Sequence, residues 1–214
     1  MSESPSLWVK VCGITREEDA RVSVEAGASA LGLNFVSRSK RRVDVELARR
    51  IADAVRGRVE LVGVVADESA ERLRELVSEV GLDWLQLHGE ESPEFLSEVP
   101  HAFKALGIER GSDVDAARRF PGTRLLLDAK SAGVSGGTGH AFDWRLVEEL
   151  AKTRPIILAG GLTPENVARA VQQVAPWGVD VAGGVESEGD ARRKDPEKVL
   201  AFVRNARRAL GDAP

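Results

Sequence analysis

The sequence predicts an α/β protein built as a single-domain (β/α)8 TIM barrel. Eight short apolar runs rich in β-forming residues alternate with eight segments of helical periodicity. The chain has 214 residues, of which 43% are hydrophobic, enough for a large and mainly aliphatic core. No linker-like stretch interrupts the alternation. We expect one barrel over residues 8–210 with flexible ends at 1–7 and 211–214, and a doubly wound open sheet is the alternative arrangement.

The strands are predicted where short apolar runs stand between polar segments. In chain order these runs are 8–11, 30–35, 61–65, 84–87, 102–106, 124–127, 155–158 and 178–181. Their length is typical of strands rather than helices, and buried parallel strands read as nearly continuous apolar runs. These runs are expected to form the barrel wall.

The helices are predicted where charged residues recur on one face between these runs. They cover 17–26, 45–55, 71–80, 93–99, 113–119, 143–150, 164–174 and 196–210. Thr15 precedes an acidic first turn, and Thr163 is a candidate N-cap before Pro164 at the first helical position. Gly27 and Gly81 stand where helices should stop.

Composition excludes several function classes. The chain has 34 acidic and 30 basic residues, for a net charge of −4, which argues against a nucleic-acid partner. One cysteine and three separated histidines offer neither a disulfide framework nor zinc spacing, so we expect no metal. No signal peptide or long apolar run is recognisable, which predicts a cytoplasmic protein without a membrane partner. Dinucleotide, P-loop, zinc-protease and serine-hydrolase motifs are absent.

Chemistry in such a barrel sits at the C-terminal ends of the strands. Cys12 directly follows the first run, on the same face as Lys10, and is a candidate base or nucleophile, although free cysteines are often merely buried. Asp128 stands just where the sixth run stops, and is placed for proton exchange or, alternatively, for capping or an ion pair with Lys130. Lys104 on the fifth run is a weaker alternative, as the amine of a Schiff-base aldolase.

Two glycine pairs follow the seventh and eighth runs, where such barrels favour phosphate. They are Gly160 with Gly161 and Gly183 with Gly184. Glycine lets backbone N–H groups approach phosphate oxygens, so phosphate binding is favoured over simple tight turns. The glycine-rich stretch 133–139 is interpreted as a lid that opens and closes.

A basic segment at 37–42 follows the second run. It lacks interleaved aromatic residues, so a nucleic-acid patch is disfavoured. A solvated run of charge and a carboxylate clamp both remain open, since an arginine fork matches a carboxylate with two parallel bonds.

Six motifs together resemble the phosphoribosylanthranilate isomerase family of tryptophan biosynthesis. They lie at 10–15 (Lys-Val-Cys-Gly-Ile-Thr), 86–89, 126–128, 136–144, 160–167 and 184–186 (Gly-Val-Glu), in the family's order. The resemblance extends from about residue 9 to 208. It implies a (β/α)8 barrel that performs an Amadori rearrangement of a phosphorylated aminoaldose without metal or cofactor. The sequence leaves the oligomeric state open between a monomer and a homodimer.

The resemblance also implies roles for individual residues. Cys12 is the expected general base and Asp128 the expected general acid. Arg41, or Arg42 in its place, is expected to hold the anthranilate carboxylate. The remaining expected substrate contacts are Gln86, His88 and Asp180, with alternatives of a structural role for His88 and a barrel-interior position for Asp180.

These roles require particular protonation states. A free thiol has a pKa of about 8.5, so Cys12 needs a positive neighbour such as Lys10 to act as a thiolate. A free aspartate has a pKa near 3.9, so Asp128 needs an apolar or anionic setting to keep its proton. The pair predicts a bell-shaped pH profile.

The chain departs from the family pattern near its eighth strand. The family commonly reads Asp-Val-Ser-Ser-Gly-Val-Glu where this chain has Ala182 and Gly183 in place of the two serines. Phosphate affinity is then expected to rest on backbone N–H groups, with a higher KM. The stretch 187–194 is also longer and more charged than usual.

Other functions remain as alternatives. The related isomerase of histidine biosynthesis uses an aspartate where Cys12 stands, which disfavours it. A non-catalytic phosphosugar binder is disfavoured because both Cys12 and Asp128 are present, and the net charge disfavours a basic-patch interaction protein.

Overall fold

Eight parallel strands close into a barrel in chain order, and the last strand pairs with the first. The computed structural model describes residues 7–129 and 143–211. The strands are β1 (Trp8–Cys12), β2 (Ala30–Asn34), β3 (Glu60–Val65), β4 (Trp84–Leu87), β5 (Ala102–Ile108), β6 (Leu125–Ala129), β7 (Ile156–Ala159) and β8 (Gly178–Val181). They confirm the predicted closed barrel and exclude the open sheet.

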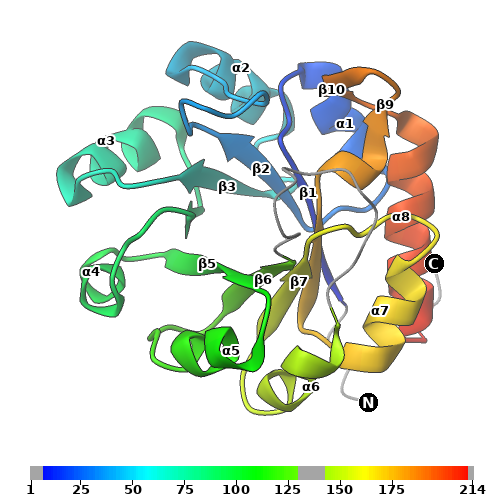
Figure 1. The fold of residues 1–214 in the computed structure, drawn as a ribbon. Helices are drawn as coiled ribbons and strands as arrows, with labels where there is room; N and C mark the ends of the chain where they lie inside the picture. The colour runs from blue at the N-terminus through cyan, green and yellow to red at the C-terminus, as the bar shows by residue number, and fades with distance from the viewer. Residues whose placement is uncertain (1–6, 130–142, 212–214) are drawn as a thin grey trace, which may run out of the picture.

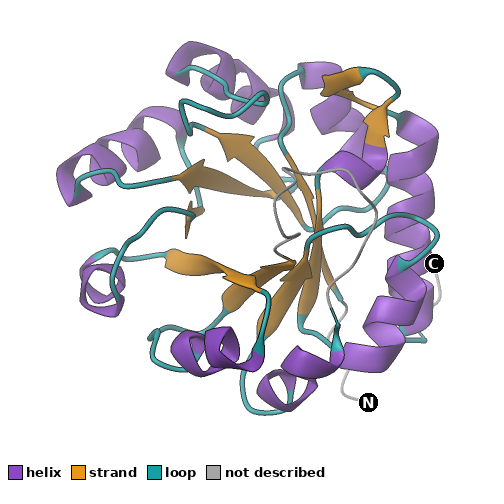
Figure 2. Ribbon diagram, viewed as in Figure 1, coloured by secondary structure: helices purple, strands orange, loops and turns teal. Residues whose placement is uncertain are grey.

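Helices surround the strands, as Figures 1 and 2 show. They are α1 (Glu17–Glu25), α2 (Val45–Val55), α3 (Ala70–Val80), α4 (Pro93–Glu98), α5 (Gly111–Ala117), α6 (Arg145–Ala151), α7 (Val167–Val174) and α8 (Pro196–Ala209). Gly81 closes α3 in the left-handed conformation, and Gly27 follows the end of α1 with a φ of 90°. Both predicted helix stops are confirmed.

Three predicted helix starts differ from the structure by two or more residues: α5 begins at 111 rather than 113, α6 at 145 rather than 143, and α7 shows the largest shift. Helix α7 begins at Val167 rather than at Pro164, and Asn166 occupies the N-cap position. The Thr163 hydroxyl instead accepts from the backbone N–H of Glu165 at 3.3 Å, which forms a local turn. The Asn166 side chain accepts from the N–H of Thr163 and donates to the carbonyl of Gly161, so this loop is held by side chains before the helix starts.

The sequence prediction missed the elements that follow β8. A single 3-10 turn, η1 (Gly183–Val185), leads into an antiparallel pair, β9 (Glu186–Ser187) and β10 (Asp190–Lys194). Four of the five β10 residues are charged, so no apolar alternation marked the strand. Figure 1 places this β9–β10 hairpin beside α1, and the backbone N–H of Lys194 donates to the Asp19 side chain of that helix at 3.0 Å.

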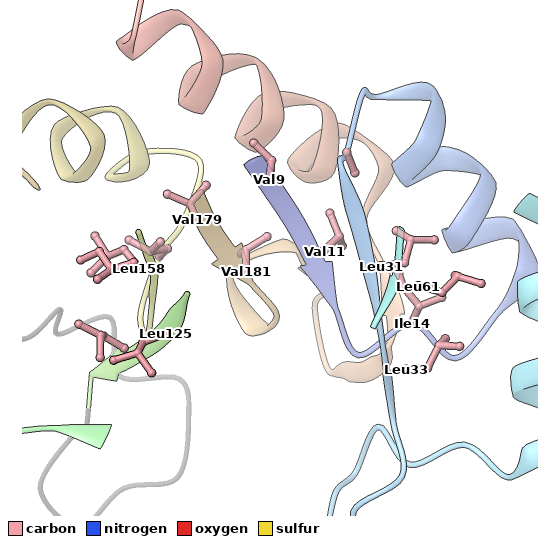
Figure 3. Packing of buried hydrophobic residues seen from close by; sticks show 14 of the residues in the cluster. Val9, Val11, Ile14, Leu31, Leu33, Leu61, Leu125, Leu158, Val179 and Val181 are labelled. Carbon is pink, nitrogen blue, oxygen red and sulfur yellow. The ribbon is translucent and has the colours of Figure 1, made fainter. Parts of the chain in front are cut away.

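The core has two layers, because side chains alternate between the two faces of each strand. The outward layer packs against the helices and includes Val9, Val11, Leu31, Val179 and Val181 (Figure 3). The inward layer fills the barrel with Trp8, Ala30, Val62, Phe103, Ala105, Leu126, Ile157 and Ala159. Leu7 is only 1% exposed, although the sequence analysis assigned it to the flexible N-terminal end.

Aromatic rings and one arginine close the N-terminal end of the barrel, which we call the floor. Arg124 precedes β6 and lies 3.8 Å from the ring centroid of Trp84 and 4.5 Å from that of Trp177. Trp8 stacks on Trp177 and donates from Nε1 to Glu60 at 2.9 Å. In the described part of the chain, no helix is both long enough and apolar enough to cross a membrane.

Candidate active site

Lys10 and Cys12 both point into the C-terminal end of the barrel from β1, as the period of two predicted. We call this end the mouth. Lys10 is fully buried and Cys12 is 8% exposed. Gly32 on the neighbouring strand makes room for both, because a Cβ there would lie 2.7 Å from the Cys12 Sγ and 3.0 Å from the Lys10 Cε. A glycine on β2 therefore shapes the site on β1.

Lys10 forms an ion pair with Asp180, its direct neighbour in register on β8. The distance between Nζ and Oδ1 is 2.8 Å. Burial favours the neutral amine, but attraction to Asp180 and Cys12 outweighs it, so the pKa of Lys10 is raised. Lys10 therefore stays an ammonium, and Asp180 lies inside the barrel with its carboxylate engaged by that charge.

Cys12 lies in a mixed electrostatic setting. Burial raises the pKa of its thiol, the Lys10 and Lys194 ammonium groups lower it, and Asp180 raises it, with burial dominant and a raised pKa as the result. Lys10 is thus the positive neighbour that the sequence suggested, but its effect does not offset desolvation. Cys12 is mainly a neutral thiol in the ligand-free protein.

Asp128 lies near the end of β6 between two small neighbours, Gly107 on β5 and Ala159 on β7. Burial raises the pKa of this carboxyl to about 6, and the nearby Asp180 adds to the shift while Lys10 opposes it. Among the described residues, the Asp128 carboxylate has no hydrogen-bond or ion-pair partner. Lys130, the alternative partner, lies outside the described residues.

Gln86 and His88 extend from β4 toward the same mouth. Gln86 is 2% exposed, its Nε2 lies 3.4 Å from the His88 Nδ1, and its Oε1 has no partner among the described residues. Burial lowers the pKa of His88, and Lys104 and Lys10 lower it further, so the imidazole is neutral near pH 7. An unpaired buried amide oxygen at a mouth is typical of a group that a ligand satisfies.

Lys104 does not reach the barrel interior. Its neighbours Phe103 and Ala105 belong to the inward layer, so Lys104 lies on the opposite face of β5. Its ammonium contacts Glu91 at 2.7 Å and the carbonyls of Gly89 and Leu87 at 2.5 and 3.3 Å. All three N–H donors of the Lys104 ammonium have partners, so this lysine has a structural role. Its amine is not available to form a Schiff base, which excludes the aldolase alternative.

Arg41 is the arginine that the structure brings to the mouth. Its stem crosses Gly13, where an added Cβ would lie 2.3 Å from the arginine Cδ, and its Nε donates to Glu186. Interaction with Glu186 raises the pKa of Arg41, and Cys12 and Asp180 contribute at longer range. Arg42 is exposed instead. Of the two arginines that the sequence left as alternatives for the carboxylate, only Arg41 is therefore placed at the mouth.

The two glycine pairs lie in the loops after β7 and β8. Gly160 and Gly161 have φ values of 86° and 64°, and a Cβ on Gly184 would lie 2.0 Å from the carbonyl oxygen of Leu162. Among the turn and loop hydrogen bonds of the described residues, none uses the N–H of Gly160, Gly161, Gly183 or Gly184. The glycines thus allow the two loops to approach closely, and their backbone N–H groups remain available to a ligand between the loops. The predicted lid at 133–139 lies outside the described residues.

Sequence reasoning missed two charged residues beside this site. Glu186 accepts from Arg41, and Lys194 lies 3.4 Å from the same carboxylate oxygen while being only 1% exposed. Glu186 had a signal in the Gly-Val-Glu motif, whereas Lys194 lies in a charged stretch that reads as solvent-exposed. The chain brings them to the mouth only by folding the β9–β10 hairpin.

Comparison with known proteins gives a consistent result. The family model described as N-(5′-phosphoribosyl)anthranilate (PRA) isomerase matches residues 9–205. The N-(5′-phosphoribosyl)anthranilate isomerase of Desulforudis audaxviator is 45% identical over 205 residues, covering 94% of this chain and 98% of the relative. The isomerase of Pseudomonas aeruginosa is 47% identical over 203 residues, covering 93% and 94%.

Solved structures agree with this. The phosphoribosylanthranilate isomerase from Thermotoga maritima superposes with a TM-score of 0.85 at 39% identity, covering 94% of this chain and 98% of that chain. A second isomerase structure, in complex with reduced 1-(o-carboxyphenylamino)-1-deoxyribulose 5-phosphate, gives a TM-score of 0.82 at 38% identity over 94% and 98%. With a family model over most of its length and relatives above 40% identity, this chain belongs to the N-(5′-phosphoribosyl)anthranilate isomerase family.

Proposed function

We propose that this chain converts N-(5′-phosphoribosyl)anthranilate into 1-(o-carboxyphenylamino)-1-deoxyribulose 5-phosphate in tryptophan biosynthesis, with Asp128 as general acid and Cys12 as general base. The observation that carries the assignment is the raised pKa of about 6 for Asp128 at the mouth that also holds Cys12. An acid and a base from separate strands then flank one ligand position.

The acid step uses the proton of Asp128. Protonation of the furanose ring oxygen breaks the bond from that oxygen to C1′, and the nitrogen lone pair forms a C=N bond, giving an open-chain iminium. Asp128 becomes a carboxylate. Its partly buried position makes it a proton donor that a solvent-exposed aspartate, with a pKa near 3.9, would not be at neutral pH.

The base step uses Cys12. The thiolate removes the proton on C2′, the C–H electrons form a C1′–C2′ double bond, and the iminium nitrogen regains its lone pair. The resulting enolamine tautomerises to the ketone. Lys10, which is paired with Asp180, lowers the pKa of Cys12 too little to offset burial. A cationic iminium beside Cys12 adds positive charge and so stabilises the thiolate further.

Three groups are proposed to bind the substrate around this pair. Arg41 takes the anthranilate carboxylate, because its Nη groups are free of hydrogen bonds to other described residues while Nε is held by Glu186. The unpaired Oε1 of Gln86 accepts from a substrate hydroxyl, with His88 and Asp180 close by. Phosphate lies between the glycine pairs at Gly160, Gly161, Gly183 and Gly184.

The pKa directions refine the expected pH profile. In the free enzyme the acid titrates near pH 6 and the base above its ordinary range, so only a small fraction carries a protonated Asp128 and a Cys12 thiolate. The product of these two fractions rises with pH up to about 6 and stays level between the pKa of Asp128 and the pKa of Cys12. It falls at pH values above the pKa of Cys12, because the thiol is then already deprotonated while Asp128 continues to lose its proton. The lower limb of kcat/KM therefore belongs to Asp128, even though this residue acts in its protonated form.

The direct test is the loss of fluorescence of N-(5′-phosphoribosyl)anthranilate, generated in place by the upstream transferase. Turnover well above the spontaneous rate supports the proposal, and a rate equal to the spontaneous one overturns it. We further propose that the enzyme acts in the cytoplasm as a monomer or homodimer, and sedimentation across a range of concentrations distinguishes the two states.

A further inference from the structure

We propose that the β9–β10 hairpin is a positioning device for Arg41, which holds both the side chain and the backbone of this arginine and aims its guanidinium at the substrate carboxylate. The inference rests on the proposed function, where Arg41 takes that carboxylate. The hairpin is built from the long charged stretch 187–194 that sets this chain apart from the family's usual pattern.

The side chain of Arg41 is held by the first residue of the hairpin. Glu186 begins β9 and accepts from the Arg41 Nε, the inner donor of the guanidinium. Among the hydrogen bonds of the described residues, this is the one that the Arg41 side chain makes. The two terminal nitrogens are therefore left for a ligand, in the fork that matches a carboxylate.

The last residue of the hairpin fixes Glu186. Lys194 ends β10, is 1% exposed, and donates from Nζ to the carbonyl of Ala182 at 3.0 Å while lying 3.4 Å from the Glu186 Oε1. Its backbone N–H donates to Asp19 of α1 at 3.0 Å. A buried ammonium with two oxygen partners restricts the Glu186 carboxylate to one place, and the bond to α1 ties the hairpin to the barrel.

The backbone around Arg41 is held by the middle of β10. Arg192 donates from Nη1 to the carbonyls of Lys40 and Arg42 at 3.2 and 3.0 Å, and these residues flank Arg41 in the chain. The carbonyl of Arg192 in turn accepts from the hydroxyl of Thr15, which lies just beyond the end of β1. The hairpin therefore makes three hydrogen bonds to the Arg41 loop, two to backbone carbonyls and one to the Arg41 side chain.

The neighbouring residue provides a matched control. Arg193 follows Arg192 on the same strand and is also exposed, and its side chain makes no hydrogen bond or ion pair to another described residue. Arg192→Met and Arg193→Met remove the same charge from adjacent positions of one strand. They differ in the contacts to the Arg41 loop.

The experiment measures the affinity of two probes for each variant by calorimetry. One probe is reduced 1-(o-carboxyphenylamino)-1-deoxyribulose 5-phosphate, and the other is the same compound without the ring carboxylate. Arg192→Met is expected to weaken the first probe about five-fold, the equivalent of one hydrogen bond, and to leave the second unchanged. Arg193→Met is expected to change neither, and KM should rise in Arg192→Met with kcat held within about two-fold.

A second variant acts on the side-chain contact. Glu186→Gln keeps an acceptor near Arg41 but removes the charge, so the carboxylated probe is expected to weaken about 30-fold and the other probe by less than about two-fold. Thermal unfolding of each variant checks that it is folded. Equal losses on both probes, or an Arg192→Met variant that matches Arg193→Met, overturn the positioning role. A wild type that binds neither probe overturns the proposed function itself.

Discussion

At the floor of the barrel, the Arg124 guanidinium lies against the rings of Trp84 and Trp177, and at the mouth Lys10 lies against Asp180. Both ends bury a cation inside the strand wall. At the floor the cation faces aromatic rings, with one carboxylate, Glu60, at 3.8 Å. At the mouth, the Lys10 ammonium lies near two further titratable groups, the thiol of Cys12 and the carboxyl of Asp128.

This difference indicates that the floor serves the stability of the barrel and the mouth serves its chemistry. Arginine keeps its charge at any physiological pH and the indole rings around it do not titrate, so the contacts between Arg124 and these rings do not change with pH. The mouth holds a thiol that burial keeps neutral and a carboxyl whose pKa burial raises to about 6. The ionised carboxyl is unfavourable at neutral pH, and a folded protein keeps it only if other contacts offset its cost. Substitutions at the floor are therefore expected to cost stability, and those at the mouth to cost activity.

The strongest test of this separation removes the proposed acid or base. Asp128→Asn and Cys12→Ala are each expected to lower kcat on the order of 10³-fold, because a positioned proton-transfer group contributes about 10²–10⁴-fold. Single-turnover fluorescence with N-(5′-phosphoribosyl)anthranilate measures the effect. Asp128→Asn should have a urea midpoint at least as high as that of the wild type, because it removes a poorly solvated carboxylate. Cys12→Ala should lower the midpoint only slightly, because it removes one buried sulfur atom from a neutral thiol.

A retained wild-type kcat in either variant would contradict the assignment of that residue. A large fall in the urea midpoint would instead place that residue among the stabilising contacts and erase the contrast with the floor. Cys12→Ser serves as the isosteric control for Cys12, since it retains shape and hydrogen bonding but loses the acidity of the thiol.

The converse change is made at the floor. Arg124→Met keeps the length of the side chain but removes the cation from the rings of Trp84 and Trp177, and also its ion pair with Glu60. We expect the free energy of unfolding to fall by about 2–3 kcal/mol, from lost cation–π contacts and packing, with kcat within about two-fold of wild type. Urea denaturation and the fluorescence assay measure the two quantities.

Arg119→Met is the control for Arg124→Met, since Arg119 is an exposed arginine in the same connection between α5 and β6 and makes no ion pair to another described residue. It should change stability by less than about 0.5 kcal/mol. A loss of kcat in Arg124→Met without a loss of stability would show that the two ends of the barrel are coupled and that the comparison fails.

The sequence was most informative about the barrel. The alternation of apolar runs and helical patterns indicated all eight parallel strands, because burial on both faces leaves a strong signal in each strand. It was weaker at α7, where the Thr163 and Asn166 side chains form a loop that resembles a helix start. Local capping chemistry alone does not distinguish these two outcomes.

For the candidate site, residues on strands were easier to predict than residues on the hairpin. The period of two places Cys12 and Lys10 on one face, and the barrel fixes the end at which they meet. Nothing local indicates that Lys194 is buried or that it faces Glu186, because that contact depends on how a charged hairpin folds back on the barrel. Pairings of this kind follow from tertiary structure.

A smaller effect concerns the pH dependence of stability. The folded-state pKa of Asp128 is about 6, above its unfolded value near 3.9, so the folded protein binds the proton more tightly. Its destabilising contribution is absent below about pH 4, grows between pH 4 and 6, and is constant above. Asp128→Asn should therefore be more stable than wild type by on the order of 2 kcal/mol at pH 7 and by little at pH 4.

Urea denaturation at the two pH values measures this difference. Arg124→Met provides the contrast from the floor, because its loss of stability comes from cation–π contacts and packing and should be the same at pH 4 and pH 7. A pH-independent effect of Asp128→Asn would mean that the carboxyl is solvated and that the mouth does not raise its pKa.

The smallest expected effect concerns the two glycine loops at the mouth that we propose bind phosphate. Gly183→Ser restores one of the hydroxyls that the family pattern carries, and a Cβ there meets no atom closer than 3.7 Å, so the loop should accept it. One added hydrogen bond to a phosphate is expected to lower KM about three- to ten-fold with kcat unchanged. Gly184→Ser is the contrasting variant, because its Cβ would lie 2.0 Å from the Leu162 carbonyl oxygen and force the two loops apart, raising KM. Steady-state kinetics at several substrate concentrations distinguish the two; an unchanged KM in Gly183→Ser would mean that the backbone donors of the four glycines already satisfy the phosphate, so that the missing hydroxyls cost this chain no affinity.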